Sequence, residues 1–357
     1  MPDYDYGNAR LHVMKSRLLA VRDFENLVES GSLQGLIAAL IKTVYQQAVE
    51  AALTRTTGME CIDEALRNDL ASTVGRVGTF YRGGAGKLVG VILESYEIQN
   101  LKAILRGLAK NVPASDTLAV LMPVGQLKLS TMRDLVRLSN PREAIDQMAS
   151  LGLPFATPLL NVRAESPGAE TFEMELALDR WHYQRARQIL RDESGTEDPL
   201  HGALNLEADL ANVLTALRFA HDPHERDLLH ERLGTDKLEH LFVGPGRIAF
   251  ALLVDASKKD AVPDAAELLE KTYFGPALEA GLDIYSRTNR LSDIERQLRH
   301  FRLDWMVKQI TRDPLGIGVV LGYIALKVNE IGNLRWIAHG INLGLKPAVI
   351  LADLEAI

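Results

Sequence analysis

The 357-residue sequence has little of several features that mark particular classes of protein. It holds one cysteine, Cys61, which excludes an internal disulfide and favours a reducing compartment. Aromatic residues make up only 6%, and runs of alternating β-branched residues are few, so strands are not favoured. Basic residues are not in excess, because 40 Lys and Arg face 47 Asp and Glu and leave a net charge of −7. We therefore expect neither nucleic acid nor an anionic lipid surface as a direct partner.

Long apolar runs are also missing. One of the longest uncharged stretches, residues 314–326, has 13 residues, whereas a transmembrane helix needs roughly 20. The N-terminus, with Asp3 and Asp5, lacks the basic-then-apolar pattern of a signal peptide. We expect a cytoplasmic chain that does not span lipid and reaches a membrane only through another protein.

Helix-forming residues and helical periodicity are plentiful. Leu, Ala, Arg and Glu are plentiful, and these residues lose little side-chain freedom in a helix. Apolar residues recur every three or four positions over residues 88–108 and 317–341, which predicts two long helices with continuous buried faces. The sequence therefore predicts an all-α fold.

Short polar patterns predict where some helices begin and where the chain connects them. Asn140 with Glu143, and Ser292 with Glu295, have the spacing of helix N-caps whose side chains satisfy free backbone amides. Residues 151–168 contain three prolines, which predicts a connection that is partly extended.

One helix signature occurs three times. It consists of an acidic residue, an Asn three positions later, and an Arg or His six positions after the Asn. The three copies are Glu97, Asn100 and Arg106; Asp209, Asn212 and Arg218; and Glu330, Asn333 and His339. Successive copies lie 112 and 121 residues apart, which is the length of a domain and too long for a solenoid repeat. This spacing predicts three helical domains, at residues 1–115, 116–235 and 236–357.

The polar residues of the signature have two interpretations. On a helix, the acid and the Asn share a face, and the basic residue falls on a neighbouring face. These side chains either tie each helix to an adjacent loop or helix end, or they contact a partner protein. We favour packing, because buried Asn side chains usually specify packing.

Beyond the signature, the chain resembles the central-stalk adaptor of rotary V-type and A-type ATPases, which is the C subunit of the prokaryotic complexes and the d subunit of the eukaryotic ones. The resemblance runs nearly end to end, through residues 6–19, 97–107, 207–218 and 312–340. One departure is His339, where the family pattern has Arg. The resemblance implies three similar helical bundles around a pseudo-threefold axis, in the shape of a funnel.

The resemblance also implies a function. Such a protein is a non-catalytic rotor component, one copy per complex, on the cytoplasmic face of the membrane ring of proteolipid subunits. It receives the shaft made by the D and F subunits and passes torque coupled to proton or sodium transport. Because catalysis belongs to other subunits, we expect no catalytic residue, no cofactor and no metal ligand in this chain.

Other functions have weaker support. Residues 81–88 are rich in glycine but lack the first Gly, the Ser or Thr and the preceding strand of a phosphate-binding loop, so a link between helices is expected. His221, His224 and His230 with Glu225 form a possible metal cluster, although their polar surroundings favour exposed histidines. The remaining alternatives are a helical-repeat adaptor of another complex and a helical enzyme.

Overall fold

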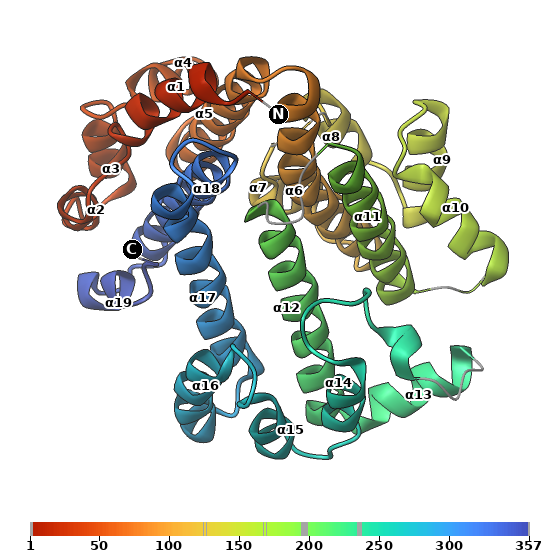
Figure 1. Cartoon of the computed structure of the whole chain (residues 1–357). Helices are drawn as coiled ribbons and strands as arrows, with labels where there is room; N and C mark the ends of the chain where they lie inside the picture. The colour runs from red at the N-terminus through yellow and green to blue at the C-terminus, as the bar shows by residue number, and fades with distance from the viewer. Residues whose placement is uncertain are drawn as a thin grey trace. The chain divides into compact units, whose positions relative to one another are not determined.

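The computed structural model describes all residues except 1, 2, 124, 126, 167, 169, 194–198, 234–237, 356 and 357. The described residues form nineteen α-helices and one short 3-10 helix, with no strand among them (Figure 1). The all-α fold class is thus confirmed. The funnel of three bundles stays a prediction, and the expected domain boundary between residues 235 and 236 lies outside the described residues.

After α1 (Asp5–Lys15), the helices follow one another three times in the same order of lengths. Each set has three helices of 7 to 14 residues, two of 22 to 27 and one of 6 to 11. The first set comprises α2 (Val21–Val28), α3 (Leu33–Leu40), α4 (Gln46–Leu53), α5 (Gly58–Phe80), α6 (Gly83–Ala109) and α7 (Ala114–Val120). The second comprises α8 (Leu129–Leu135), α9 (Pro141–Ser150), α10 (Ala156–Glu165), α11 (Thr171–Glu193), α12 (Pro199–His221) and α13 (Pro223–Leu233). After the 3-10 helix η1 (Leu238–Leu241), the third comprises α14 (Phe250–Ser257), α15 (Val262–Leu269), α16 (Gly275–Thr288), α17 (Leu291–Arg312), α18 (Gly318–Asn342) and α19 (Pro347–Ala352).

The chain folds into two compact units. Unit 1 contains Met1–Thr157 and Val307–Ile357, and unit 2 contains Pro158–Met306. These boundaries fall inside the second and third helix sets, in α10 and α17. The division into three domains at residues 115 and 235 therefore stays a prediction.

In unit 1, the helix predicted over residues 317–341 is α18, and it packs against α1, α2, α3 and α5 (Figure 1). Asn8 fastens α1 to this group, because its Nδ2 donates to the carbonyl of Gly316 at 2.9 Å. The hydroxyl of Tyr81, at the end of α5, donates to Asn8 Oδ1 at 2.9 Å. Gly7 allows this close approach, since a Cβ there would overlap the ring of Tyr81.

In unit 2, α12 packs against α14 and α15, the first two helices of the third set (Figure 1). The side chains between them, among them Val213, Leu217, Leu253 and Leu269, are completely buried. Each such side chain contributes about 1.5–3 kcal/mol through removal from water, before the loss of chain entropy is counted. A helix of one set and helices of the next therefore share one core.

The short polar patterns predicted some boundaries correctly and others wrongly. Asn140 caps α9 as expected, because its Oδ1 accepts the amide of Glu143 at 2.9 Å. Ser292 is not an N-cap, since α17 begins one residue earlier, at Leu291. Residues 151–168 contain α10, because a proline is tolerated in the first turn of a helix and Pro158 lies there.

The glycine-rich residues 81–88 lie mostly within a helix. Only Tyr81 and Arg82 separate α5 from α6, and Gly83 begins the first turn of α6.

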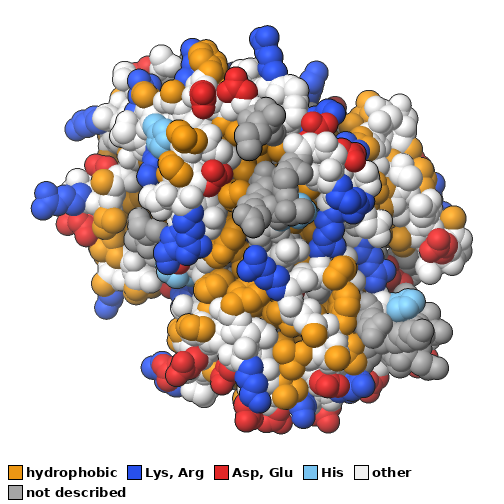
Figure 2. Space-filling view, viewed as in Figure 1, with side chains coloured by type: hydrophobic (Ala, Val, Ile, Leu, Met, Phe, Trp, Pro, Cys, Tyr) orange, Lys and Arg blue, Asp and Glu red, His pale blue; other side chains and the backbone are white. Residues whose placement is uncertain are grey.

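Figure 2 shows acidic and basic side chains interspersed over the face in view. Among the described residues, no helix combines the length and the apolar character needed to cross a membrane.

Candidate functional site

The three signature segments lie on the fifth helix of each set, α6, α12 and α18. The acid and the Asn of every copy are buried, with exposed fractions of 6% or less. These six residues are Glu97, Asn100, Asp209, Asn212, Glu330 and Asn333. The last residue of each copy differs from them, because Arg106 and His339 are exposed and Arg218 is half-buried.

Each signature Asn holds the backbone of a segment that follows its helix. Its Nδ2 donates to a carbonyl, and its Oδ1 accepts a backbone amide, so both ends of the side-chain amide are used. The partners are Met122 for Asn100 (2.5 and 2.8 Å), the Gly244 carbonyl and the Val243 amide for Asn212 (2.9 Å each), and Glu355 for Asn333 (3.0 Å each). The side chain thereby fixes an irregular segment against a helix, because buried backbone groups require partners.

Each signature acid accepts the backbone amide that lies two residues before the first helix of a set. Glu97 accepts the amide of Leu127 before α8, and Asp209 accepts the amide of Ile248 before α14 at 3.2 Å. Glu330 accepts the amide of Leu19 before α2 at 2.5 Å. A carboxylate at this place is stabilised by the free amides and the partial positive charge of a helix N-terminus. The acids therefore tie each signature helix to the start of another set.

Glycine makes room for the acid in two of the copies. A Cβ on Gly125 would overlap the carboxylate of Glu97, and a Cβ on Gly246 would overlap that of Asp209. Both glycines stand two residues before the amide that the acid accepts. A glycine, one further residue and then Leu or Ile before a helix is a sequence signal for these anchors, and it lies outside the helix signature itself.

The third copy is part of a larger buried charge cluster in unit 1. The Nζ of Lys327, on α18, lies 2.9 Å from Asp69 Oδ2 and 3.0 Å from Glu330 Oε1, and it donates to the Tyr45 hydroxyl at 2.8 Å. The Tyr45 hydroxyl in turn donates to Glu330. Burial, and then the negative charge of Glu330, raises the pKa of Tyr45 well above its ordinary value. Each buried charge thus has an opposite charge beside it, as buried ions require.

In the second copy, Asp209 collects three donors. It accepts the amides of Arg247 and Ile248 and the hydroxyl of Tyr273, the latter at 2.7 Å. Burial and the bond to Asp209 raise the pKa of Tyr273. Asp209 is completely buried, so these donors replace the water that the carboxylate gives up.

Arg335, two positions after the third signature Asn, is a structural residue that the repeated pattern does not reveal. Its Nη2 donates to the carbonyl of Leu121 at 3.0 Å, next to the Met122 backbone that Asn100 holds. Side chains of two signature helices, α6 and α18, therefore bond the backbone of the same segment, at Leu121 and Met122. Burial lowers the pKa of Arg335 to about 10, although the nearby Asp63 opposes this shift.

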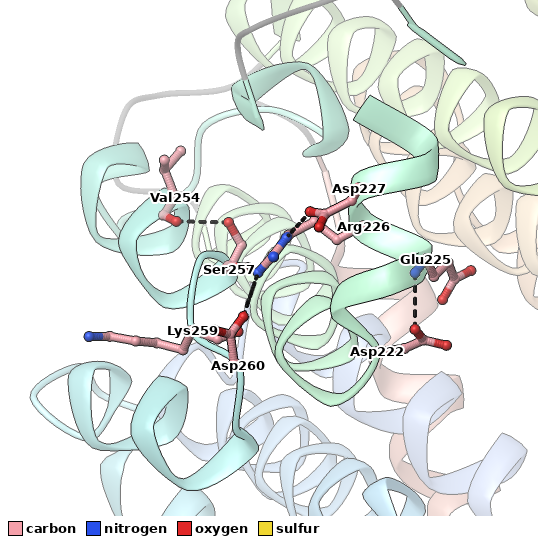
Figure 3. A network of polar contacts seen from close by, with 8 residues as sticks. All are labelled: Asp222, Glu225, Arg226, Asp227, Val254, Ser257, Lys259 and Asp260. Carbon is pink, nitrogen blue, oxygen red and sulfur yellow. Dashed lines mark hydrogen bonds and ion pairs between the residues drawn. The ribbon is translucent and has the colours of Figure 1, made fainter. Parts of the chain in front are cut away.

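A second polar network lies in unit 2, where α13 meets the end of α14 (Figure 3). The guanidinium of Arg226 donates to Asp227 at 2.8 Å and to the carbonyl of Ser257 at 3.2 Å. It also lies 3.5 Å from Asp260. Because the last carbonyls of a helix lack partners within it, Arg226 satisfies the C-terminus of α14.

The possible metal ligands are not brought together within the described part of the chain. His221 lies at the end of α12, where its Nδ1 is 3.3 Å from the Tyr285 hydroxyl. The side chain of His230 lies outside the described residues. No group of three His, Cys, Asp or Glu side chains with the spacing of a metal site occurs among the residues that the structure describes.

The fold and the anchors define an all-α protein assembled from repeated helix sets that buried polar side chains fasten together. The sequence matches the family model described as "ATP synthase (C/AC39) subunit" over residues 7–352. It is 24% identical to the C subunit of the A-type ATP synthase of Methanocaldococcus jannaschii, covering 97% of this chain and 85% of that protein. It is 25% identical to the C subunit of the V-type ATP synthase of Deinococcus radiodurans, covering 100% of this chain and 92% of that protein.

The chain therefore belongs to the ATP synthase (C/AC39) subunit family, which confirms the resemblance noted in the sequence. It is a component of a rotary ATPase complex, and its part in that complex is structural and not catalytic.

Proposed function

We propose that the chain is the central-stalk adaptor of its complex. In this role it links the shaft made by the D and F subunits to the membrane ring of proteolipid subunits, on the cytoplasmic face of the membrane. One copy passes torque between the two, coupled to proton or sodium transport. Family membership and the near full-length similarity to the C subunits of A-type and V-type ATP synthases support this proposal.

The observation that carries the proposal is the repeated buried anchor. A body that transmits torque has to resist deformation where its parts join. In the first two copies, the acid and the Asn bond the backbone of the segment that joins one helix set to the next. In the third copy, Glu330 bonds the backbone before the first set and Asn333 bonds the backbone after the last helix. Breaking such a contact leaves buried polar groups unpaired, which costs about 1–3 kcal/mol for each group. The joints are therefore stiffer than free linkers.

We assign the acid and the Asn of each copy to this structural task. All six side chains are buried and are bonded to the chain's own backbone, so they are not presented to a partner. Arg106 and His339 are exposed and Arg218 is half-buried, so the last residue of the signature does not share the burial of the acid and the Asn. This assignment agrees with the interpretation favoured from the sequence, in which the acid and the Asn of the signature serve packing within the chain and not contact with a partner protein.

Affinity purification of the tagged chain from native membranes tests the adaptor role. We expect the shaft subunits in near-equal proportion to the chain, together with the proteolipid ring, when the recovered subunits are counted by quantitative mass spectrometry. Recovery of the chain without any rotary ATPase subunit would contradict the proposal. The chain purified alone should show no ATP hydrolysis, and reproducible turnover by it would indicate an enzyme.

Small-angle scattering of the purified chain tests the stiffness. We expect the curve of one compact body whose dimensions do not change with salt concentration. A curve typical of separate bodies on flexible tethers would show that the anchors do not hold the helix sets together.

A further inference from the structure

A surface pocket of about 420 Å³ lies between the start of α1 and the end of α5, within unit 1. Its lining includes Asp3, Tyr6, Arg10, Phe80 and Arg82, and we call it the Arg10 pocket. None of these residues takes part in the signature anchors. The pocket therefore needs an explanation of its own.

Arg10 is held at the pocket by two aromatic rings. Its Cζ lies 4.8 Å from the centre of the Tyr6 ring and 5.1 Å from that of Phe80, and the two rings are nearly perpendicular at 87°. Such stacking over aromatic faces restrains a guanidinium without using its N–H groups. Among the described residues, Arg10 has no hydrogen-bond acceptor and no ion-pair partner, so its N–H donors remain available.

The helix that carries Arg10 is itself fixed. The adjacent residues Gly7 and Asn8 face inward, where Asn8 bonds Tyr81 and Gly316 at 2.9 Å each. Tyr6 and Arg10 are one turn apart on the opposite, exposed side of α1. A ligand of Arg10 would therefore meet a preorganised donor, which lowers the entropy lost on binding.

The charge of the pocket limits the ligand. Among the described lining residues, two arginines and one aspartate leave a single net positive charge, which matches a carboxylate better than a doubly charged phosphate. Val13 continues the exposed side of α1 beyond Tyr6 and Arg10, and Tyr6 and Val13 are 61% and 54% exposed. An apolar surface beside a free guanidinium fits a protein segment that carries an acidic side chain among apolar ones.

We propose that the Arg10 pocket binds an Asp or Glu side chain of a neighbouring subunit. The carboxylate accepts two parallel N–H bonds from the guanidinium of Arg10, and the apolar side chains around it cover Tyr6 and Val13. The inference requires only that the chain is one subunit of a larger complex. The inference does not depend on whether the neighbouring subunit is part of the shaft, part of the ring or neither. It can therefore fail or succeed separately from the adaptor role.

The substitution Arg10→Lys tests this proposal in the assembled complex. A lysine at this position offers an amine that a zero-length carbodiimide reagent joins to a carboxylate in direct contact. After purification from native membranes, we expect peptide mass spectrometry to show the substituted position 10 linked to an Asp or Glu of another subunit. The control is Arg17→Lys, an exposed site beyond the end of α1, where we expect about tenfold less product.

The substitution Arg10→Ala gives an independent measurement. We expect the chain to dissociate from the neighbouring subunit at a lower salt concentration than the unsubstituted chain does. The affinity between the two subunits should fall about 10-fold to 100-fold, while circular dichroism shows an unchanged fold. The proposal is overturned if the complex assembles but no link forms at position 10, or if Arg10→Ala leaves the salt dependence unchanged. It is also overturned if Arg10→Ala instead abolishes flotation of the isolated chain with phosphatidylglycerol vesicles, which would indicate a lipid phosphate as the ligand.

Discussion

Asn212 offers the sharpest test of the signature anchors, because its side chain is completely buried and, within the described part of the chain, bonds two backbone groups and nothing else. The substitution Asn212→Ala removes the acceptor of the Val243 amide and the donor to the Gly244 carbonyl, both at 2.9 Å. Val243 is only 6% exposed, so water does not reach its amide without local opening. Gly244 is half-buried, and its carbonyl regains a water molecule more easily.

The expected loss of stability follows from this asymmetry. An unsatisfied buried amide costs about 1–3 kcal/mol, and the hydrated carbonyl adds little. With the small void left by the amide group, we expect Asn212→Ala to lower the free energy of unfolding of unit 2 by about 2–3 kcal/mol. The matched control is Thr215→Ala on the same helix, whose hydroxyl donates to the carbonyl of Ala211 one turn earlier. We expect that change to be neutral within about 0.5 kcal/mol.

Urea unfolding followed by circular dichroism measures the loss, and hydrogen exchange of the Val243 amide locates it. The variant should unfold at lower urea with an unchanged slope, and this amide should exchange faster. Equal stabilities of Asn212→Ala and Thr215→Ala would refute the reasoning, as would an unchanged exchange rate at Val243. Either result would mean that the Asn does not hold this segment.

Three further changes test other parts of the structure. Gly246→Ala places a Cβ on the carboxylate of Asp209, so we expect a loss of about 1–3 kcal/mol in urea unfolding, and an unchanged midpoint would contradict the close approach. Cys61 is completely buried and burial raises the pKa of its thiol, so iodoacetamide should label it only in denaturant, and rapid labelling of the native chain, seen by mass spectrometry, would contradict this. Burial, and then the charge of Glu330, raises the pKa of Tyr45 above its ordinary value of 10.0. Above that pH the folded state keeps a proton that the unfolded chain releases, so the free energy of unfolding should fall as the pH rises. Tyr45→Phe should weaken that fall in alkaline unfolding curves, and an equal slope for both proteins would refute the contribution of Tyr45.

The sequence predicted the helices well where a long apolar period was present. Residues 88–108 and 317–341 correspond to α6 and α18, because a periodic face of that length has no other way to be buried. Short signals were less reliable. Ser292 has the spacing of an N-cap, yet α17 already begins at Leu291. The prolines of residues 151–168 did not prevent α10.

The signature residues were visible because they recur, but their partners were not. Backbone amides and carbonyls are present at nearly every residue, so the residue types do not indicate that the Asn100 side chain bonds the backbone of Met122. The repeated pattern did not identify Arg335, for the opposite reason. Arg335 stands where the other copies have Lys102 and Leu214, and a pattern of shared residues does not include a residue that is present in one copy.

The third acid shows how the helix sets depend on one another. Glu97 and Asp209 reach forward along the chain to the amides before α8 and α14, whereas Glu330 reaches back to the amide of Leu19 before α2. Each set thus has its first helix anchored by the signature helix of another set, and the last set anchors the first. A force applied to one set then acts on the next through a buried carboxylate at a helix N-terminus, where both the free amides and the helix dipole oppose separation. The same three acids that identify the repeat in the sequence therefore connect its copies in the structure.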